Sequence, residues 1–173
     1  MDFIVIVALV ALALVLKFST RESKTVEESE IQHFKKEFLT TQSERKLYFA
    51  LREVLGSNYS IHCQTSLIAL VEPTQFKHKS KAWSKRMDYV ITDTNTKILA
   101  VIELDDPSHN QPKRIARDKY VNCALKGLHP LVRLKTQSYY DQVDVAKELY
   151  LQAGIKSKKL PVEYTQPLIG EQQ

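Results

Sequence analysis

Two stretches, MDYVITD at residues 87–93 and ILAVIELDDPSH at residues 98–109, decide the fold of this 173-residue chain. Each contains a run of β-branched and other apolar residues that is typical of a buried strand. The four residues between the stretches, TNTK at 94–97, are typical of a turn. The sequence therefore predicts a β-hairpin made of two buried strands.

Acidic residues stand at the strand ends that this hairpin would bring together. Asp88 lies near the start of the first strand, and Glu103, Asp105 and Asp106 lie at the end of the second. Because antiparallel pairing places the start of one strand beside the end of the next, we expect Asp88 and Glu103 to be neighbours at one rim of the sheet. Neighbouring carboxylates repel each other unless a cation lies between them, and oxygen ligands suit Mg²⁺ or Mn²⁺. We interpret both acids as metal ligands, with a main-chain carbonyl near Leu104 as a third; the alternative is that they cap turns or pair with Lys and Arg.

Helical and strand patterns alternate along the rest of the domain. Thr41 and Glu44 form a capping-box pattern, which opens a helix with apolar residues at three- and four-residue steps. The capping role is an alternative to any catalytic role of Glu44. The pattern predicts a mixed α/β fold, a central sheet flanked by helices. Its expected elements are a helix from 41 to Gly56, strands at 59–63 and 66–71, the hairpin, a helix at 111–126, a strand at 128–134 and a helix at 139–152.

The charge and the cysteines of the chain exclude little. Lys and Arg number 25 against 20 Asp and Glu, which gives a net charge of +5 and a pI near 9.1. This excess permits a polyanionic partner such as nucleic acid without requiring one. Cys63 and Cys123 are the two cysteines, and two isolated cysteines fit neither a disulfide framework nor a zinc site. We expect both to be reduced thiols in the core.

Basic residues with interleaved aromatic residues fill the segment from 72 to 86, which we expect to be a loop. Such a loop beside a carboxylate site suits a phosphate backbone and a stacked base. The alternative is a solvated loop in which Trp83 packs on the sheet. In the following helix, Arg114 and Asp118 are four residues apart and could simply pair with each other. The candidate nucleic-acid-binding residues are Lys79, Lys81, Trp83, Lys85, Arg86, Arg114 and Arg117.

The N-terminal segment is apolar and uncharged from residue 3 to residue 16. With Lys17 and Phe18, this segment reaches the short end of the lengths that cross a bilayer as a helix. Basic residues directly after it predict, by the positive-inside rule, that the C-terminal domain lies in the cytoplasm. We therefore expect a single-pass anchor at 1–18 in the inner (cytoplasmic) membrane and a polar linker at 19–36. A cleaved signal peptide and a buried core helix are the alternatives. We expect the folded α/β domain to span 37–152, followed by a loose tail at 153–173.

Five short motifs, taken together, resemble a known family. They are Thr41-Gln-Ser-Glu44-Arg45, Arg86-Met-Asp88-Tyr-Val, Val101-Ile-Glu103-Leu-Asp105-Asp106-Pro-Ser-His109, Arg117-Asp118-Lys119 and Gly127-Leu-His-Pro-Leu-Val-Arg133. From about residue 39 to residue 151 the chain resembles a prokaryotic domain family of the PD-(D/E)XK nuclease superfamily, close to the Vsr-like mismatch-endonuclease branch. The resemblance implies a restriction-endonuclease-like fold and a metal-dependent nuclease. It implies Asp88 and Glu103 as metal-binding acids and Glu44 as the first-helix acid.

One departure from the superfamily pattern concerns the basic residue of the site. The superfamily places a lysine two residues after the second acid, where this chain has Asp105. The Vsr-like branch also lacks that lysine, and the resemblance maps Asp105, His109, Asp118 and Lys119 onto further positions of its pattern. A basic residue near the metal helps to stabilise charge in the transition state. We expect Lys119, Lys85 or Arg86 to supply it, and His109 or Lys119 to serve as a proton shuttle or electrostatic partner.

These patterns support two principal functions. The first is a membrane-tethered nuclease that uses Mg²⁺ or Mn²⁺ to hydrolyse phosphodiester bonds in DNA. The second is an inactive nuclease-fold module that binds nucleic acid or a protein partner at the membrane. A third reading is a structural membrane protein in which the acids only pair with basic residues.

Overall fold

The computed structural model describes residues 33–105 and 112–164, with the backbone alone at 112–114. The expected anchor at 3–18, most of the expected linker, His109 and residues 165–173 lie outside this part of the chain. Within the described residues, no helix has both the length and the apolar character needed to cross a bilayer.

The predicted hairpin forms the centre of a four-stranded sheet with the order β1-β2-β3-β4. Its strands are β2 (Arg86–Asp93) and β3 (Ile98–Asp105), which pair antiparallel. The Asp93 carboxylate accepts hydrogen bonds from the backbone N–H groups of Asn95 and Lys97 at 2.9 and 2.8 Å, which closes the turn. On the outer sides, β1 (Tyr59–Ser66) pairs antiparallel with β2, and β4 (Leu131–Lys135) pairs parallel with β3. The hairpin prediction is confirmed, and the sheet is mixed.

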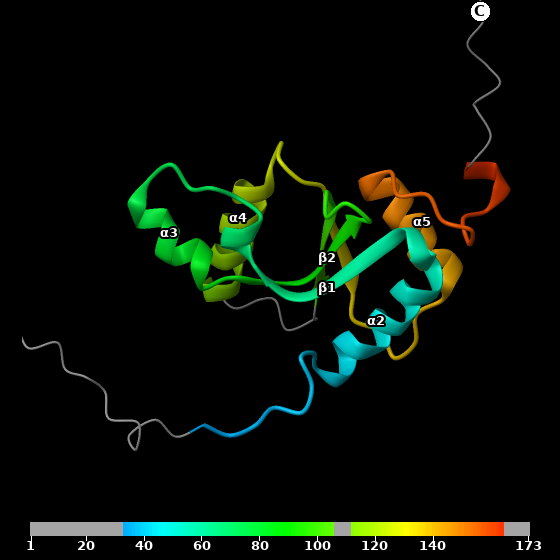
Figure 1. The fold of residues 1–173 in the computed structure, drawn as a ribbon, viewed down its shortest axis with the longest axis horizontal. Helices are drawn as coiled ribbons and strands as arrows, with labels where there is room; N and C mark the ends of the chain where they lie inside the picture. Colours follow the sequence, from blue (N-terminus) through cyan, green and yellow to red (C-terminus); the bar gives the residue numbers. More distant parts are fainter. Residues whose placement is uncertain (1–32, 106–111, 165–173) are drawn as a thin grey trace, which may run out of the picture. The chain divides into compact units, whose positions relative to one another are not determined.

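In the described part of the chain, four α-helices cover the two faces of this sheet (Figure 1). Helices α2 (Gln42–Leu55) and α5 (Gln142–Ala153) lie together on one side, and α3 (Phe76–Trp83) and α4 (Pro112–Leu125) lie on the other. The predicted capping box at the start of α2 is present, and Gly56 ends this helix with a positive φ of 65°. The mixed α/β class predicted from the sequence is therefore confirmed.

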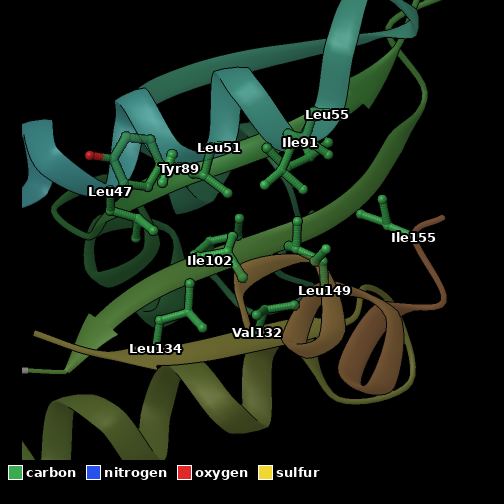
Figure 2. Close-up of a cluster of buried hydrophobic side chains, with 14 of the residues drawn as sticks. Leu47, Leu51, Leu55, Tyr89, Ile91, Ile102, Val132, Leu134, Leu149 and Ile155 are labelled. Atoms are coloured by element: carbon green, nitrogen blue, oxygen red, sulfur yellow. The ribbon is translucent and has the colours of Figure 1, made fainter. Parts of the chain in front are cut away.

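The core consists of two apolar clusters, one on each face of the sheet. Figure 2 shows the larger cluster, in which Tyr89 and Ile91 of β2 and Ile102 of β3 pack against α2 and α5. On the opposite face, Val90 and Val101 pack with residues of α3 and α4. Alternate residues of the hairpin strands thus face opposite clusters, as the period of a strand buried on both faces requires. Both faces are covered, so the side chains of the central strands reach solvent at the strand ends.

The segment from 59 to 85 differs from its prediction. One strand, β1, runs through Gln64, where a φ of 53° marks an irregularity in the pairing, and a short 3₁₀ turn at Leu67–Ala69 replaces the expected second strand. The segment expected to be a loop contains helix α3. Only Ala82 of this helix is buried, so the sequence shows no apolar stripe that would have predicted it.

The end of the chain also differs from its prediction. Residues 153–164 were expected to be loose, but Ile155 and Leu160 are buried in the larger cluster. The Tyr59 hydroxyl donates a hydrogen bond to the Lys156 carbonyl at 3.1 Å. Two isolated apolar residues give no periodic signal, which is why sequence patterns missed this packing.

Candidate functional site

Acidic side chains from four elements line one cavity of about 370 Å³ at the rim of the sheet. We call it the acidic cavity. Arg117 of α4 lines the same cavity and is its basic residue among those described. The acids are Glu44 of α2, Asp88 of β2, Glu103 and Asp105 of β3, and Asp118 of α4.

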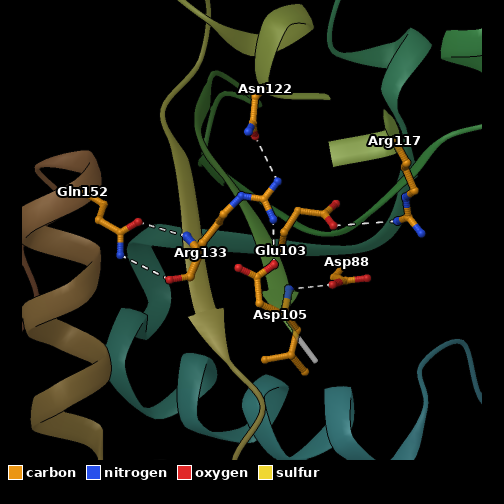
Figure 3. Close-up of polar contacts among 8 residues, drawn as sticks. Asp88, Glu103, Asp105, Arg117, Asn122, Arg133 and Gln152 are labelled. Carbon is orange, nitrogen blue, oxygen red and sulfur yellow. Dashed lines mark hydrogen bonds and ion pairs between the residues drawn. The ribbon is translucent and has the colours of Figure 1, made fainter. Parts of the chain in front are cut away.

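The register of the hairpin brings Asp88 and Glu103 to this cavity. Tyr89 pairs with Ile102, so one step further along the antiparallel ladder Asp88 comes beside Glu103. The backbone N–H of Leu104 donates a hydrogen bond of 2.7 Å to Asp88 Oδ2, which fixes the carboxylate at the end of β3 (Figure 3). The two acids that the sequence pattern placed together thus share one cavity.

Burial makes the negative charge of these two acids unfavourable. Burial, and after it the charge of Asp88, raises the pKa of Glu103 to about 7, while Arg117 and Arg133 oppose the shift. The pKa of Asp88 is also raised, first by burial and then by the charge of Glu44, while the N–H of Leu104 opposes the shift. A cation near both carboxylates would favour their charged forms. Such a cluster of raised pKa values in a cavity is typical of functional sites.

Two buried polar atoms at this site accept or donate no hydrogen bond within the described part of the chain. They are Glu103 Oε1 and Arg117 Nε. The contact between the two side chains is long, with 3.8 Å from Arg117 Nη2 to Glu103 Oε2. Leaving buried polar atoms unpaired costs about 1–3 kcal/mol each. The Glu103–Arg117 pair therefore leaves bonding capacity for a further partner.

The acids of the cavity can supply some, but not all, of the ligands of a divalent cation. Among residues 33–105 and 112–164, no three His, Cys, Asp or Glu side chains lie together as a metal-holding group. Mg²⁺, however, commonly takes only one or two protein carboxylates and keeps several waters. Asp88 and Glu103 supply that number, and Glu103 Oε1 is a buried acceptor that receives no hydrogen bond from the described residues. The residues fit a hydrated ion and do not fit a closed all-protein metal site.

Asp105 lines the acidic cavity but is held by a basic side chain of the neighbouring strand. Arg133 Nη1 donates to Asp105 Oδ1 at 2.6 Å, and Arg133 Nη2 donates to Asn122 Oδ1 of α4 at 2.9 Å (Figure 3). On the other side, the backbone of Arg133 exchanges hydrogen bonds with the amide of Gln152 in α5. Arg133 thus connects β3, β4, α4 and α5 behind the site. The sequence pattern did not assign it a role, because only the parallel pairing of β3 and β4 places it there.

Glu44 combines its capping role with a place at the site. Its Oε2 atom accepts hydrogen bonds from the backbone N–H of Thr41 at 2.8 Å and from the amide of Gln64 at 3.3 Å. The Tyr89 hydroxyl donates to the Glu44 carbonyl at 2.7 Å, which attaches the first turn of α2 to β2. Glu44 also lines the acidic cavity. The capping alternative is therefore observed, and it does not remove the side chain from the cavity.

The basic residue beside the acids is Arg117 and not Lys119. Lys119 is exposed on α4 and is not among the residues that line the acidic cavity. The helical period explains the difference, since residues two positions apart face different directions on a helix. His109 lies outside the described residues, and Asp118 lines the cavity.

A second cavity, of about 470 Å³, joins the acidic cavity to the basic segment. The two share Glu44, Asp88 and Arg117, and the second adds Trp83, Lys85 and Arg86 among its lining residues. We call it the basic groove. The alternative in which Trp83 packs on the sheet is wrong, because this side chain is 73% exposed.

The other predicted nucleic-acid contacts are more scattered. Lys81 lies over the Tyr120 ring of α4, with Nζ 4.4 Å from the ring centroid. Lys79 lines a different hollow. The side chain of Arg114 lies outside the described residues. The basic groove thus contains Trp83, Lys85, Arg86 and Arg117 of the seven predicted residues.

A mixed α/β domain with a cavity at the rim of its sheet, lined by the buried Glu103 and the half-buried Asp88, defines the class of this protein. Residues 35–153 match the model of a family described as "Protein of unknown function (DUF2726)". Because the match covers more than half of the chain, the protein belongs to this family. Searches of curated proteins and of solved structures found no match.

Proposed function

We propose that this protein is a metal-dependent nuclease that hydrolyses phosphodiester bonds in DNA. The observation that carries the proposal is the meeting of Asp88, Glu103 and Arg117 in a cavity that continues into a basic groove. The first two residues suit a divalent cation, and the groove suits a phosphate backbone. The mixed sheet with helices on both faces is compatible with a restriction-endonuclease-like core, which is part of the proposal.

Each side chain has a distinct task in the proposed reaction. Asp88 and Glu103 would hold Mg²⁺ or Mn²⁺, and the Leu104 N–H keeps the Asp88 carboxylate oriented. The ion, when bound, supplies Lewis acidity to the phosphodiester and to a water nucleophile. Arg117 stabilises negative charge on the phosphate, which is the task of the missing motif lysine. Asp105, neutralised by Arg133, supports the end of β3.

The alternative is an inactive nuclease-fold module that binds nucleic acid or a protein partner. Two observations favour it. Asp105 stands where the superfamily pattern has lysine, and Arg117 approaches Glu103 itself. An arginine that neutralises a buried acid permanently would replace the cation and leave a binding surface without chemistry.

A cleavage assay separates the two functions. The purified 173-residue chain is incubated with labelled single-stranded and duplex DNA in Mg²⁺, Mn²⁺ or EDTA. We expect cleavage that needs the cation and falls at least 100-fold in Asp88→Asn and in Glu103→Gln, both of which keep side-chain size. Glu53→Gln, a change at an exposed glutamate of α2, is the matched control. Equal cleavage by the wild type and both site variants would refute the assigned residues, whereas DNA binding without cleavage would favour the inactive module.

Residues 3–18 are part of the proposal as a membrane anchor that leaves the domain in the cytoplasm. Their apolar sequence and the basic residues that follow support this topology. Membrane fractionation of cells that express the full chain tests it. We expect the chain in the inner-membrane fraction, resistant to alkaline extraction, and release of a variant that lacks residues 1–18.

A further inference from the structure

A third hollow shares Trp83 with the basic groove and shares no lining residue with the acidic cavity. It has a volume of about 750 Å³, within the range of roughly 300–1,000 Å³ that is typical of small-molecule sites. One wall is the chain from Ile68 to Pro73, and the other is α3, which contributes Lys79, Ser80 and Trp83. We call it the α3 hollow. Trp83 lines both the α3 hollow and the basic groove, so it stands where the two meet.

The lining of the α3 hollow is suited to a flat, partly polar ring. Leu70, Val71 and Pro73 contribute apolar surface to the hollow, and Lys79 and Glu72 contribute one charge of each sign. Trp83 presents a largely exposed indole there. An exposed indole beside the apolar residues of the hollow offers a large surface for a partner to cover. An aromatic ring beside basic residues is the usual arrangement for stacking a base while the backbone is held by charge.

We propose that the α3 hollow binds an unpaired nucleobase, stacked on Trp83, of the same strand whose phosphodiester lies at the acidic cavity. This inference rests on the proposed function and narrows its substrate to DNA with unpaired bases. In an intact duplex both faces of each base are stacked, and the outer surface presents phosphates. A base reaches an aromatic platform on a protein surface only when it is single-stranded or turned out of the helix.

The charge of α3 supports a nucleic-acid occupant over an apolar peptide. Lys77, Lys79 and Lys81 all belong to this eight-residue helix, and it contains no acidic residue. Lys85 and Arg86 continue the positive charge into the basic groove. A strand that passes from the α3 hollow through the basic groove would therefore meet basic side chains before it reaches Arg117 and the acids.

Trp83 is the only tryptophan of the chain, so its fluorescence reports on the proposed site directly. The purified 173-residue chain is titrated in EDTA, which prevents cleavage, with an oligothymidylate and with a duplex of equal length. We expect saturable quenching by the single strand, at an affinity at least tenfold higher than that of the duplex. Fluorescence anisotropy of labelled DNA measures the same affinities in variants. Trp83→Ala should weaken single-strand binding by roughly 5- to 150-fold, the range for losing one stacked base.

Matched variants separate stacking from general charge and from misfolding. Phe76→Ala removes another exposed aromatic side chain of α3, one that lines neither the α3 hollow nor the basic groove, and should leave affinity unchanged. Lys79→Ala should weaken binding more than Lys77→Ala, since only Lys79 lines the hollow. Circular dichroism establishes that each variant is folded.

The outcomes for the base site and for the nuclease are distinguishable. Absence of DNA binding, binding without a change in fluorescence, or equal affinity for single strand and duplex overturns the base site. An affinity unaffected by Trp83→Ala overturns it as well. Quenching together with single-strand preference in a chain that cuts no DNA would support the base site and remove the nuclease. Cleavage of duplex DNA at the wild-type rate by Trp83→Ala would support the nuclease and overturn the base site.

Discussion

In the metal-free protein, the gain in stability of Glu103→Gln over the wild type should be larger at alkaline pH than at acidic pH. Glu103 is 7% exposed, and its pKa in the folded protein is about 7 against an ordinary value of 4.5. As the pH rises from about 4.5 to 7, the unfolded chain loses this proton while the folded protein keeps it. The free energy of unfolding therefore falls over that window, and the lost stability is not regained above pH 7. The glutamine variant has no proton to lose and keeps its stability.

The difference between the folded and the ordinary pKa of Glu103 gives the size of this change in the free energy of unfolding. A difference of about 2.5 pKa units at about 1.4 kcal/mol per unit corresponds to about 3 kcal/mol between pH 5 and pH 8. For a domain of this size, this amount corresponds to a change in Tm of roughly 10 °C. The raised pKa of Asp88 contributes to both proteins, so the comparison between them reports Glu103 together with its interaction with Asp88.

Urea denaturation in EDTA at pH 5 and at pH 8 measures this difference, with circular dichroism as the readout. The quantity of interest is the gain of Glu103→Gln over wild type at pH 8 minus the same gain at pH 5. Glu53→Gln, at an exposed site, should give a value near zero. A value near zero for Glu103→Gln, or a negative one, would refute the argument that burial and the charge of Asp88 hold a proton on this acid.

The remaining predictions concern the basic side chain at the site and the cap of helix α2. Arg117→Met should reduce metal-dependent cleavage by about 100-fold or more, because it removes the basic side chain from the acidic cavity. Lys119→Met, two residues along the same helix, should retain cleavage. A larger loss in Lys119→Met than in Arg117→Met would instead support Lys119, the residue chosen from the sequence. Thr41→Ala removes the hydroxyl that accepts the Glu44 N–H at 3.3 Å and should lower the free energy of unfolding by about 1 kcal/mol in urea denaturation. Thr74→Ala, in an exposed position, is its control, and an equal loss in both variants would contradict the capping argument.

Local patterns in the sequence determined the elements with strong periodicity. The alternation of the hairpin strands, the turn between them and the capping box of α2 each involve residues close together in the chain. Their conformations follow from neighbours within a few positions, so the sequence predicted them and the approach of Asp88 to Glu103. Helices α4 and α5 were also predicted from the sequence.

Tertiary structure alone decided which other residues reach the acids. Arg117 approaches Glu103 because of how α4 packs on the sheet, and Arg133 meets Asp105 because β4 pairs parallel with β3. The exposure of Trp83 likewise depends on α3, a helix with a single buried residue and no periodic signal. These contacts join residues that are many positions apart in the chain, and their geometry depends on packing that no local pattern encodes. The sequence by itself placed the two acids together. Only the packing of the helices placed the basic side chain of Arg117 beside them and formed the cavity and the groove that leads to it.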